Sequence, residues 1–200
     1  MKKIAIITFL LAFCVAAGRA QESRQDISIS GTAVVEPFVG SSTDVYVSAN
    51  RAFGALASYR FMLTPSSAIE ANYGITYENT IHYKAFPNNY KVLVRTQEAS
   101  GAYVQSFNFK KLNPFLEAGG GALIFLPILN SGTTTLDTKQ QTQMGLLYGG
   151  GIAYEISPSF DIRAEFRGLI TKVPTFGDGQ FTTNKWYNIY DPVIGVAYHF

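Results

Sequence analysis

The sequence predicts an all-β protein that forms an eight-stranded antiparallel up-and-down barrel across a membrane. Apolar and polar residues alternate with a period of two in segments separated by turn residues, as in strands with one apolar face. Charged residues make up only 15% of the chain, against roughly 25% in soluble domains, while 47% of the residues are hydrophobic. After residue 20, no apolar run approaches the roughly 18 residues of a membrane-spanning helix, so we expect strands to face the lipid.

The N-terminal segment has the features of a secretory signal peptide. Two lysines precede an apolar run over residues 4–15, broken only by Thr8, and small residues follow up to Ala20. We expect cleavage after Ala20, although Ala17 also satisfies the small-residue rule. The signal peptide would then cover residues 1–20, and residues 21–200 would form one β-barrel domain.

Charge and cysteine content exclude several function classes. Removing residues 1–20 takes away three basic residues and no acid, so 16 basic residues fall to 13 against 14 acids, and the formal charge of +2 becomes −1. No Lys/Arg cluster is left, so we expect no nucleic-acid partner. The single cysteine, Cys14, lies in the signal segment, which removes disulfides and thiolate metal sites. The glycine runs lack the Lys-Ser/Thr of a phosphate loop and the loop aspartates lack calcium-loop spacing, so we expect no cofactor and no metal.

Eight segments are long enough to cross a bilayer at a tilt, which takes roughly 9 to 11 residues. These predicted strands are 27–39, 50–62, 68–82, 97–109, 114–126, 142–156, 160–172 and 186–200. Short turns alternate with longer polar connections, the asymmetry of short periplasmic turns and longer outer loops. The predicted turns are 63–67, 110–113 and 157–159, and the predicted longer connections are 40–49, 83–96, 127–141 and 173–185. In strand 97–109, Gln105 interrupts an apolar face, which indicates a bulge or a different boundary.

The strand at 160–172 separates its two faces clearly. Phe160, Ile162 and Phe166 share one face, while Arg163 and Arg167 share the other. Alternation alone does not say which face points outward, because a soluble lipocalin-like barrel with an apolar ligand cavity has the same period. The low charge content and the aromatic residues near strand ends favour the membrane-spanning alternative.

The closing strand carries a resemblance to a known family. Val196, Tyr198 and Phe200 share its apolar face, and the sequence ends in Tyr-His-Phe. Together with the signal peptide and eight alternating strands, this resembles the small outer-membrane barrels, namely the OmpA transmembrane domain, OmpX and the N-terminal domain of OprF, over essentially the whole mature chain. The resemblance implies a Gram-negative outer membrane, contacts with its lipid and lipopolysaccharide, and a role for the three residues as the signal read by the barrel-assembly machinery. Because a closed barrel has no free edge, we expect a monomer.

Ionisable residues on the inward parity belong in the lumen, since they are costly at membrane depth. The set comprises Glu36, Arg60, Glu70, Glu117, Glu155, Asp161, Arg163, Glu165 and Arg167. We expect a packed network that blocks the lumen. The alternative is a narrow water-filled pore in which the excess of acids favours cations.

The function expected from these features is a non-enzymatic structural or surface-interaction role through the outer loops. A narrow passive diffusion pore is the main alternative, and a lipid A-modifying enzyme or a soluble ligand-binding barrel is less favoured. Catalytic candidates are few, because His82 and His199 are the only histidines. His82 could pair with Glu78, but no deacylase-like His-x-Ser-Asn run surrounds it.

Overall fold

The computed structural model describes residues 24–40, 45–77, 79–85, 88–128, 139–177 and 182–200. The predicted signal peptide, residues 1–20, lies outside the described residues. In the described ranges, no helix is long and apolar enough to cross a membrane. The described chain is built from eleven strands: β1 (Gln25–Val34), β2 (Val39–Gly40), β3 (Val45–Ala49), β4 (Ala52–Thr64), β5 (Ser67–Thr76), β6 (Asn79–Ala85), β7 (Asn88–Ser106), β8 (Leu112–Pro127), β9 (Gln141–Ser157), β10 (Phe160–Lys172) and β11 (Trp186–His199).

Eight of these strands close into an antiparallel barrel, as predicted. The hydrogen-bonded order β7-β5-β4-β1-β11-β10-β9-β8 returns to β7, because β7 also pairs with β8. The first and last strands, β1 and β11, pair from Asp26↔His199 to Thr32↔Val193. Each of the eight barrel strands is therefore hydrogen-bonded to a neighbouring strand on both sides.

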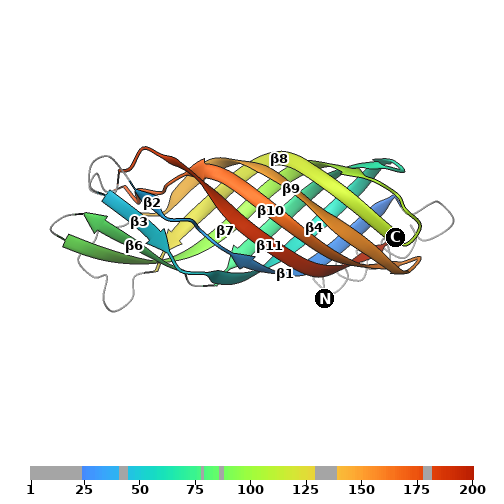
Figure 1. Ribbon diagram of the computed structural model, residues 1–200, viewed down its shortest axis with the longest axis horizontal. Helices are drawn as coiled ribbons and strands as arrows, with labels where there is room; N and C mark the ends of the chain where they lie inside the picture. The colour runs from blue at the N-terminus through green and yellow to red at the C-terminus, as the bar shows by residue number, and fades with distance from the viewer. Residues whose placement is uncertain (1–23, 41–44, 78, 86–87, 129–138, 178–181) are drawn as a thin grey trace, which may run out of the picture.

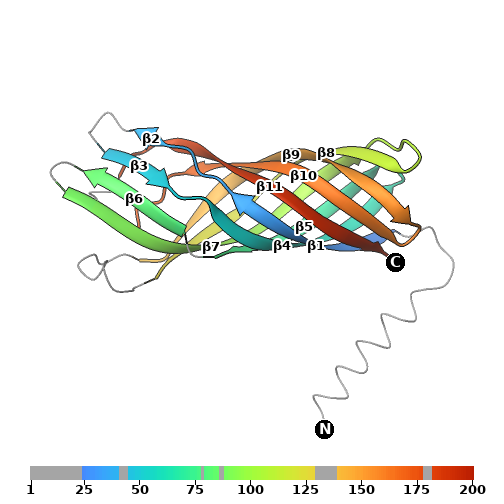
Figure 2. The ribbon, with the colours of Figure 1, turned by 60° about the horizontal axis from the view of Figure 1, so that its bottom comes forward.

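The two ends of the barrel differ. The short turns and the C-terminus lie at one end, called the inner end here, and β2, β3 and β6 lie at the opposite, outer end (Figures 1 and 2). Antiparallel pairing continues outward there, because β3 pairs with β6 and β6 pairs with the first half of β7. The short strands β2, β3 and β6 thus extend the barrel wall beyond the ends of β4 and β5 (Figure 1).

Two predicted connections are wrong in part. Residues 45–49 of the predicted connection 40–49 form β3, and the predicted connection 83–96 is mostly strand because β7 begins at Asn88. The polar residues of these segments concealed an alternation whose apolar members, Val47, Val92 and Val94, are buried inside the outer end. These segments form strands because β3 pairs with β6 and β6 pairs with β7. Their polar composition does not predict this pairing.

The short turns at the inner end are confirmed, with one shifted boundary. β4 and β5 are joined by Pro65 and Ser66, and β9 and β10 by Pro158 and Ser159. β7 ends at Ser106 rather than at residue 109, so the turn to β8 is longer than expected. The poor fit of Gln105 has a simple cause, since it lies at the inner rim and its Nε2 donates to the Ser66 carbonyl oxygen at 2.9 Å. A bulge is not needed there, because pairing with β5 and β8 is continuous through Gln105.

The direction of the side chains distinguishes a membrane-spanning barrel from a soluble lipocalin-like barrel. On β10, Phe160, Ile162 and Phe166 point outward, and Phe166 is 52% exposed. Arg163 and Arg167 of the same strand are buried inside the barrel, and Arg167 is 0% exposed. Because the outer wall is apolar and the interior carries the charges, the surface matches a lipid environment, and the soluble lipocalin-like alternative is excluded.

The glycines of β8 allow the neighbouring strands to approach closely. A Cβ atom added at Gly119 would lie less than 3.0 Å from backbone atoms of Gly101 and Ala102. By contrast, a Cβ atom added at Gly31 of β1 would meet nothing within 4 Å.

We predict that Gly119→Ala lowers the free energy of unfolding by about 1–3 kcal/mol, because backbone atoms cannot move aside without disturbing the ladder. Gly31→Ala, the matched control, should leave stability unchanged. Urea unfolding of the protein in lipid vesicles, followed by the fluorescence of the single tryptophan, Trp186, measures both. Equal stability of the two variants would show that the β7–β8 approach is not constraining.

Candidate functional site

The lumen is filled by ionic groups, and the first of them lies at the inner end. This inner cluster consists of Asp26, Asp161, Arg163 and His199. Arg163 binds Asp26 in a bidentate manner, with Nη1–Oδ1 at 3.0 Å and Nη2–Oδ2 at 2.7 Å. The Nε2 atom of His199 lies 2.8 Å from Oδ2 of Asp161. The cluster therefore joins β1, β10 and β11, the strands at the seam where the barrel closes.

A cross-strand pair forms the next layer. Arg60 of β4 donates from Nε to Oε2 of Glu70 on β5 at 2.7 Å, and its Nη2 lies 2.6 Å from the same oxygen. The guanidinium of Arg60 also stacks over the ring of Phe115, 4.8 Å from the ring centroid. Both charged side chains are buried, so each compensates the charge of the other away from water.

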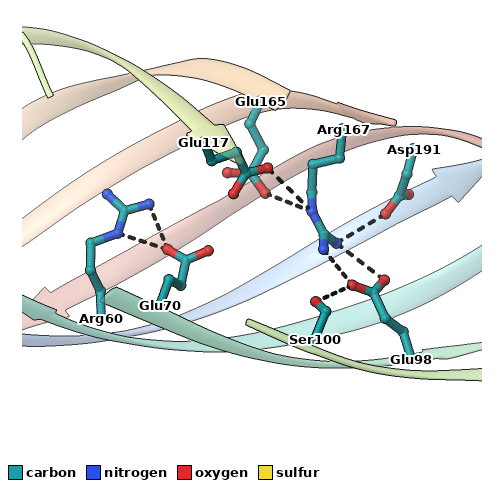
Figure 3. A network of polar contacts seen from close by, with 8 residues as sticks. All are labelled: Arg60, Glu70, Glu98, Ser100, Glu117, Glu165, Arg167 and Asp191. Carbon is teal, nitrogen blue, oxygen red and sulfur yellow. Dashed lines mark hydrogen bonds and ion pairs between the residues drawn. The ribbon is translucent and has the colours of Figure 1, made fainter. Parts of the chain in front are cut away.

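The largest group is centred on Arg167 (Figure 3). This Arg167 group comprises Arg167 and four carboxylates that lie within 4.0 Å of its guanidinium: Glu98 at 2.5 Å, Asp191 at 3.3 Å, Glu117 at 3.5 Å and Glu165 at 4.0 Å. The acids come from β7, β8, β10 and β11. Because Arg167 itself lies on β10, its guanidinium links β10 to three other strands. Ser100 donates a further hydrogen bond to Glu98 at 2.5 Å.

The Arg167 group contains more acid than base. Four carboxylates share one guanidinium, and neither side-chain oxygen of Glu117 accepts a hydrogen bond from the described residues. Burying an uncompensated charge is costly, so further positive charge or protons would lower the free energy of this layer.

The outer half of the lumen is apolar. The outer apolar cap comprises Val47, Ile81, Tyr83, Val92, Val94, Phe125, Val173 and Phe176, all buried. Phe176 follows β10 and turns inward, where its ring meets that of Tyr83 edge-on at 6.2 Å. The Oε1 atom of Gln141 accepts hydrogen bonds from the backbone N–H groups of Thr175 and Phe176, at 2.7 and 2.9 Å, and holds this turn in place.

The structure places most of the predicted lumen residues in these three groups and two outside them. The Arg60–Glu70 pair, the inner cluster and the Arg167 group account for seven of the nine predicted residues. Glu36 is buried farther outward, where it accepts hydrogen bonds from Asn79 at 3.0 Å and Tyr187 at 3.5 Å. Glu155 is only half-buried near the inner rim and joins none of these groups.

Three lumen acids were missed by the sequence prediction: Asp26, Glu98 and Asp191. All three follow the inward parity: Asp26 alternates with Ser28 and Ser30, Glu98 with Ser100, and Asp191 with Val193. Asp26 lies one residue before the predicted strand start, and Asp191 precedes Pro192. Glu98 and Asp191 lie within the predicted strands 97–109 and 186–200, so applying the inward parity along these strands would have found both, and Asp26 required a strand start only one residue earlier.

The two candidate catalytic histidines lie at opposite ends of the barrel. His82 is half-buried on β6, and its suggested partner Glu78 lies outside the described residues. His199 belongs to the inner cluster, where two carboxylates flank its ring.

A closed barrel with an apolar wall and a charged, filled lumen defines a transmembrane β-barrel protein of an outer membrane. The sequence pattern of the family described as "Outer membrane protein beta-barrel domain" matches residues 5–200. The chain therefore belongs to this family of bacterial outer-membrane barrels.

Solved structures share the fold at low sequence identity. Neisserial surface protein A (NspA) is 16% identical with a TM-score of 0.61, covering 89% of this chain and 98% of that one. OprG from Pseudomonas aeruginosa is 12% identical with a TM-score of 0.66, covering 90% and 98%. Ail, the attachment invasion locus protein of Yersinia pestis, is 16% identical with a TM-score of 0.51, covering 90% and 100%. No curated protein matches the sequence.

We predict that Arg167→Leu destabilises the barrel by roughly 3–5 kcal/mol, because it leaves several buried carboxylates without their cation. The control is Arg95→Leu, the same change at an exposed position of β7. Urea unfolding in lipid vesicles measures both variants. If Arg167→Leu is as stable as the natural protein, the guanidinium does not hold the lumen together.

Proposed function

We propose that this protein is a non-enzymatic outer-membrane barrel whose lumen is closed and which acts through its outer end. The observation that carries the proposal is the fully buried Arg167 with carboxylates from four strands around it. An eight-stranded barrel is just wide enough for its own side chains, so a packed ionic layer obstructs the path of solutes. The outer apolar cap supplies a second obstruction.

The outer end supports a surface-interaction role. There β3, β6 and β7 extend the sheet past β4 and β5, which sets this part of the wall beyond the rest of the barrel (Figure 1). Phe38 and Tyr46 stack on its exposed surface with ring centroids 5.7 Å apart. We propose lipopolysaccharide and outer-membrane lipid as the contacts of this surface. Ail, which shares the fold, has been crystallised in complex with the heparin analogue sucrose octasulfate.

Export and assembly form the finer part of the proposal. Residues 1–20 would direct export and be cleaved, and Val196, Tyr198 and Phe200 would be read by the barrel-assembly machinery. These three residues share the outward face of the closing strand, where the rings of Tyr198 and Phe200 stack at 6.1 Å. The backbone N–H of Phe200 donates to the Gln25 carbonyl oxygen at 3.0 Å, so the end of the chain lies at the seam with β1. The mature protein would be a monomer.

We predict no sustained single-channel current from the purified protein in planar bilayers, because the Arg167 group and the outer apolar cap both block the lumen. The combined variant Arg167→Ala, Phe176→Ala removes one large side chain from each obstruction and should pass more current than either single variant. Heat-modifiable gel mobility establishes that each variant is folded. Sustained current from the natural protein would instead support the diffusion-pore alternative.

We predict that Phe200→Ala reduces the amount of barrel assembled in the outer membrane several-fold while export across the inner membrane continues. Phe109→Ala, which removes an exposed aromatic ring from the β7–β8 turn, is the control and should assemble normally. Immunoblots of outer-membrane fractions, with heated and unheated samples side by side, give the assembled fraction. Normal assembly of Phe200→Ala would remove the assembly-signal role.

A further inference from the structure

A cavity lies in the lumen outward of Arg167. It is partly open to solvent and has room only for a small ligand. Glu98 and Asp191 of the Arg167 group line it, as do Glu36 and Asn79. The cavity therefore lies where the ionic filling of the barrel gives way to the apolar one.

Three oxygen atoms of residues lining this cavity have no hydrogen-bond partner among the described residues: Thr32 Oγ1, Asn79 Oδ1 and Asp191 Oδ1. All three side chains are buried, and Asn79 and Asp191 are each only 3% exposed. The amide of Asn79 is oriented by Glu36, because its Nδ2 donates to Oε1 of Glu36 at 3.0 Å and leaves the oxygen unpaired. Buried acceptors without a donor are costly, so a ligand with several N–H groups would be stabilised by donating hydrogen bonds to these oxygens.

The charge of the cavity has one sign. Glu36, Glu98 and Asp191 line it, and the nearest cation, Arg167, already shares its charge among four carboxylates. Among the described residues, no arginine or lysine forms an ion pair with Glu36. The Glu36 carboxylate instead accepts hydrogen bonds from Asn79 and Tyr187. A cation in this cavity would gain from an electrostatic field that is screened little by water.

Most of the remaining lining is apolar, which selects among cations. Leu56, Leu123 and Ile189 are buried side chains that form part of the wall. In the described residues there is no group of three or more histidine, cysteine or acidic side chains placed to hold a metal ion. An organic cation places carbon against the leucines and N–H groups against the oxygens, whereas a bare metal ion would leave much of its coordination shell unfilled.

We propose that this cavity binds a small primary ammonium ion that carries a short apolar chain. Its ammonium group donates toward the unpaired oxygens of Thr32, Asn79 and Asp191, and the carboxylates of Glu36 and Glu98 supply the compensating charge. Its apolar chain packs against Leu56, Leu123 and Ile189. This binding site goes beyond the proposed surface role and does not depend on it.

The test uses the whole mature protein in lipid nanodiscs with butylammonium chloride as the probe. Ligand-observed saturation-transfer NMR, with empty nanodiscs as the background, should show saturable binding of butylammonium and much weaker binding of 1-butanol. Potassium chloride at matched ionic strength should not displace the probe. Absence of saturable binding overturns the proposal, as does equal binding of 1-butanol or displacement by potassium.

Variants locate the site. Glu36→Gln removes one charge and Asn79→Leu removes one unpaired oxygen, and each should weaken binding roughly tenfold. Asn72→Leu is the matched control, because Asn72 is also a buried asparagine with unpaired side-chain atoms but does not line the cavity. Heat-modifiable gel mobility shows that each variant is folded. Unchanged binding in Glu36→Gln and Asn79→Leu, or an equal loss in Asn72→Leu, places the ammonium elsewhere and overturns the site.

Discussion

The interaction on which the rest of the structure depends is the ionic contact of Arg167 with carboxylates from β7, β8, β10 and β11. A barrel of eight strands has no room for a water-filled channel around such groups, so its charges must compensate one another. Because the outer wall faces lipid, the strands cannot turn these side chains outward. The lumen is thus the place where the polar residues of all the strands meet, and their pairing ties together strands that are far apart in the chain.

The two ends of the lumen are filled by different kinds of side chain. At the inner end, Asp26, Arg163 and His199 lie at the seam between the first and last strands, so ion pairs reinforce the backbone pairing that closes the barrel. At the outer end, the outer apolar cap fills the lumen with valine and aromatic side chains, and Phe176 enters it from the segment after β10. Directional ion pairs therefore lie at the closing seam, while non-directional packing lies at the end with the extended strands.

The cavity lies at the boundary between these two kinds of filling. Ionic and apolar layers differ in what they need from a neighbour, because carboxylates require donors and leucines require carbon contacts. Where they meet, Thr32, Asn79 and Asp191 keep unpaired oxygens beside buried leucines. Such a boundary suits an amphipathic ligand better than it suits more protein side chains.

The sequence by itself determined the number of barrel strands, their antiparallel connection and the inward parity of the charged residues. It could do so because a strand with one lipid-facing side must repeat every two residues, and that period is local. The extension of the wall by β3, β6 and the first half of β7 was decided by tertiary pairing, since segments 40–49 and 83–96 contain many polar residues. Only the closed barrel could show that Glu98 and Asp191 meet at Arg167, that Glu155 stays apart and that Phe176 lies inside. These outcomes depend on strand register and on distances across the lumen, and neither quantity is encoded within a single strand.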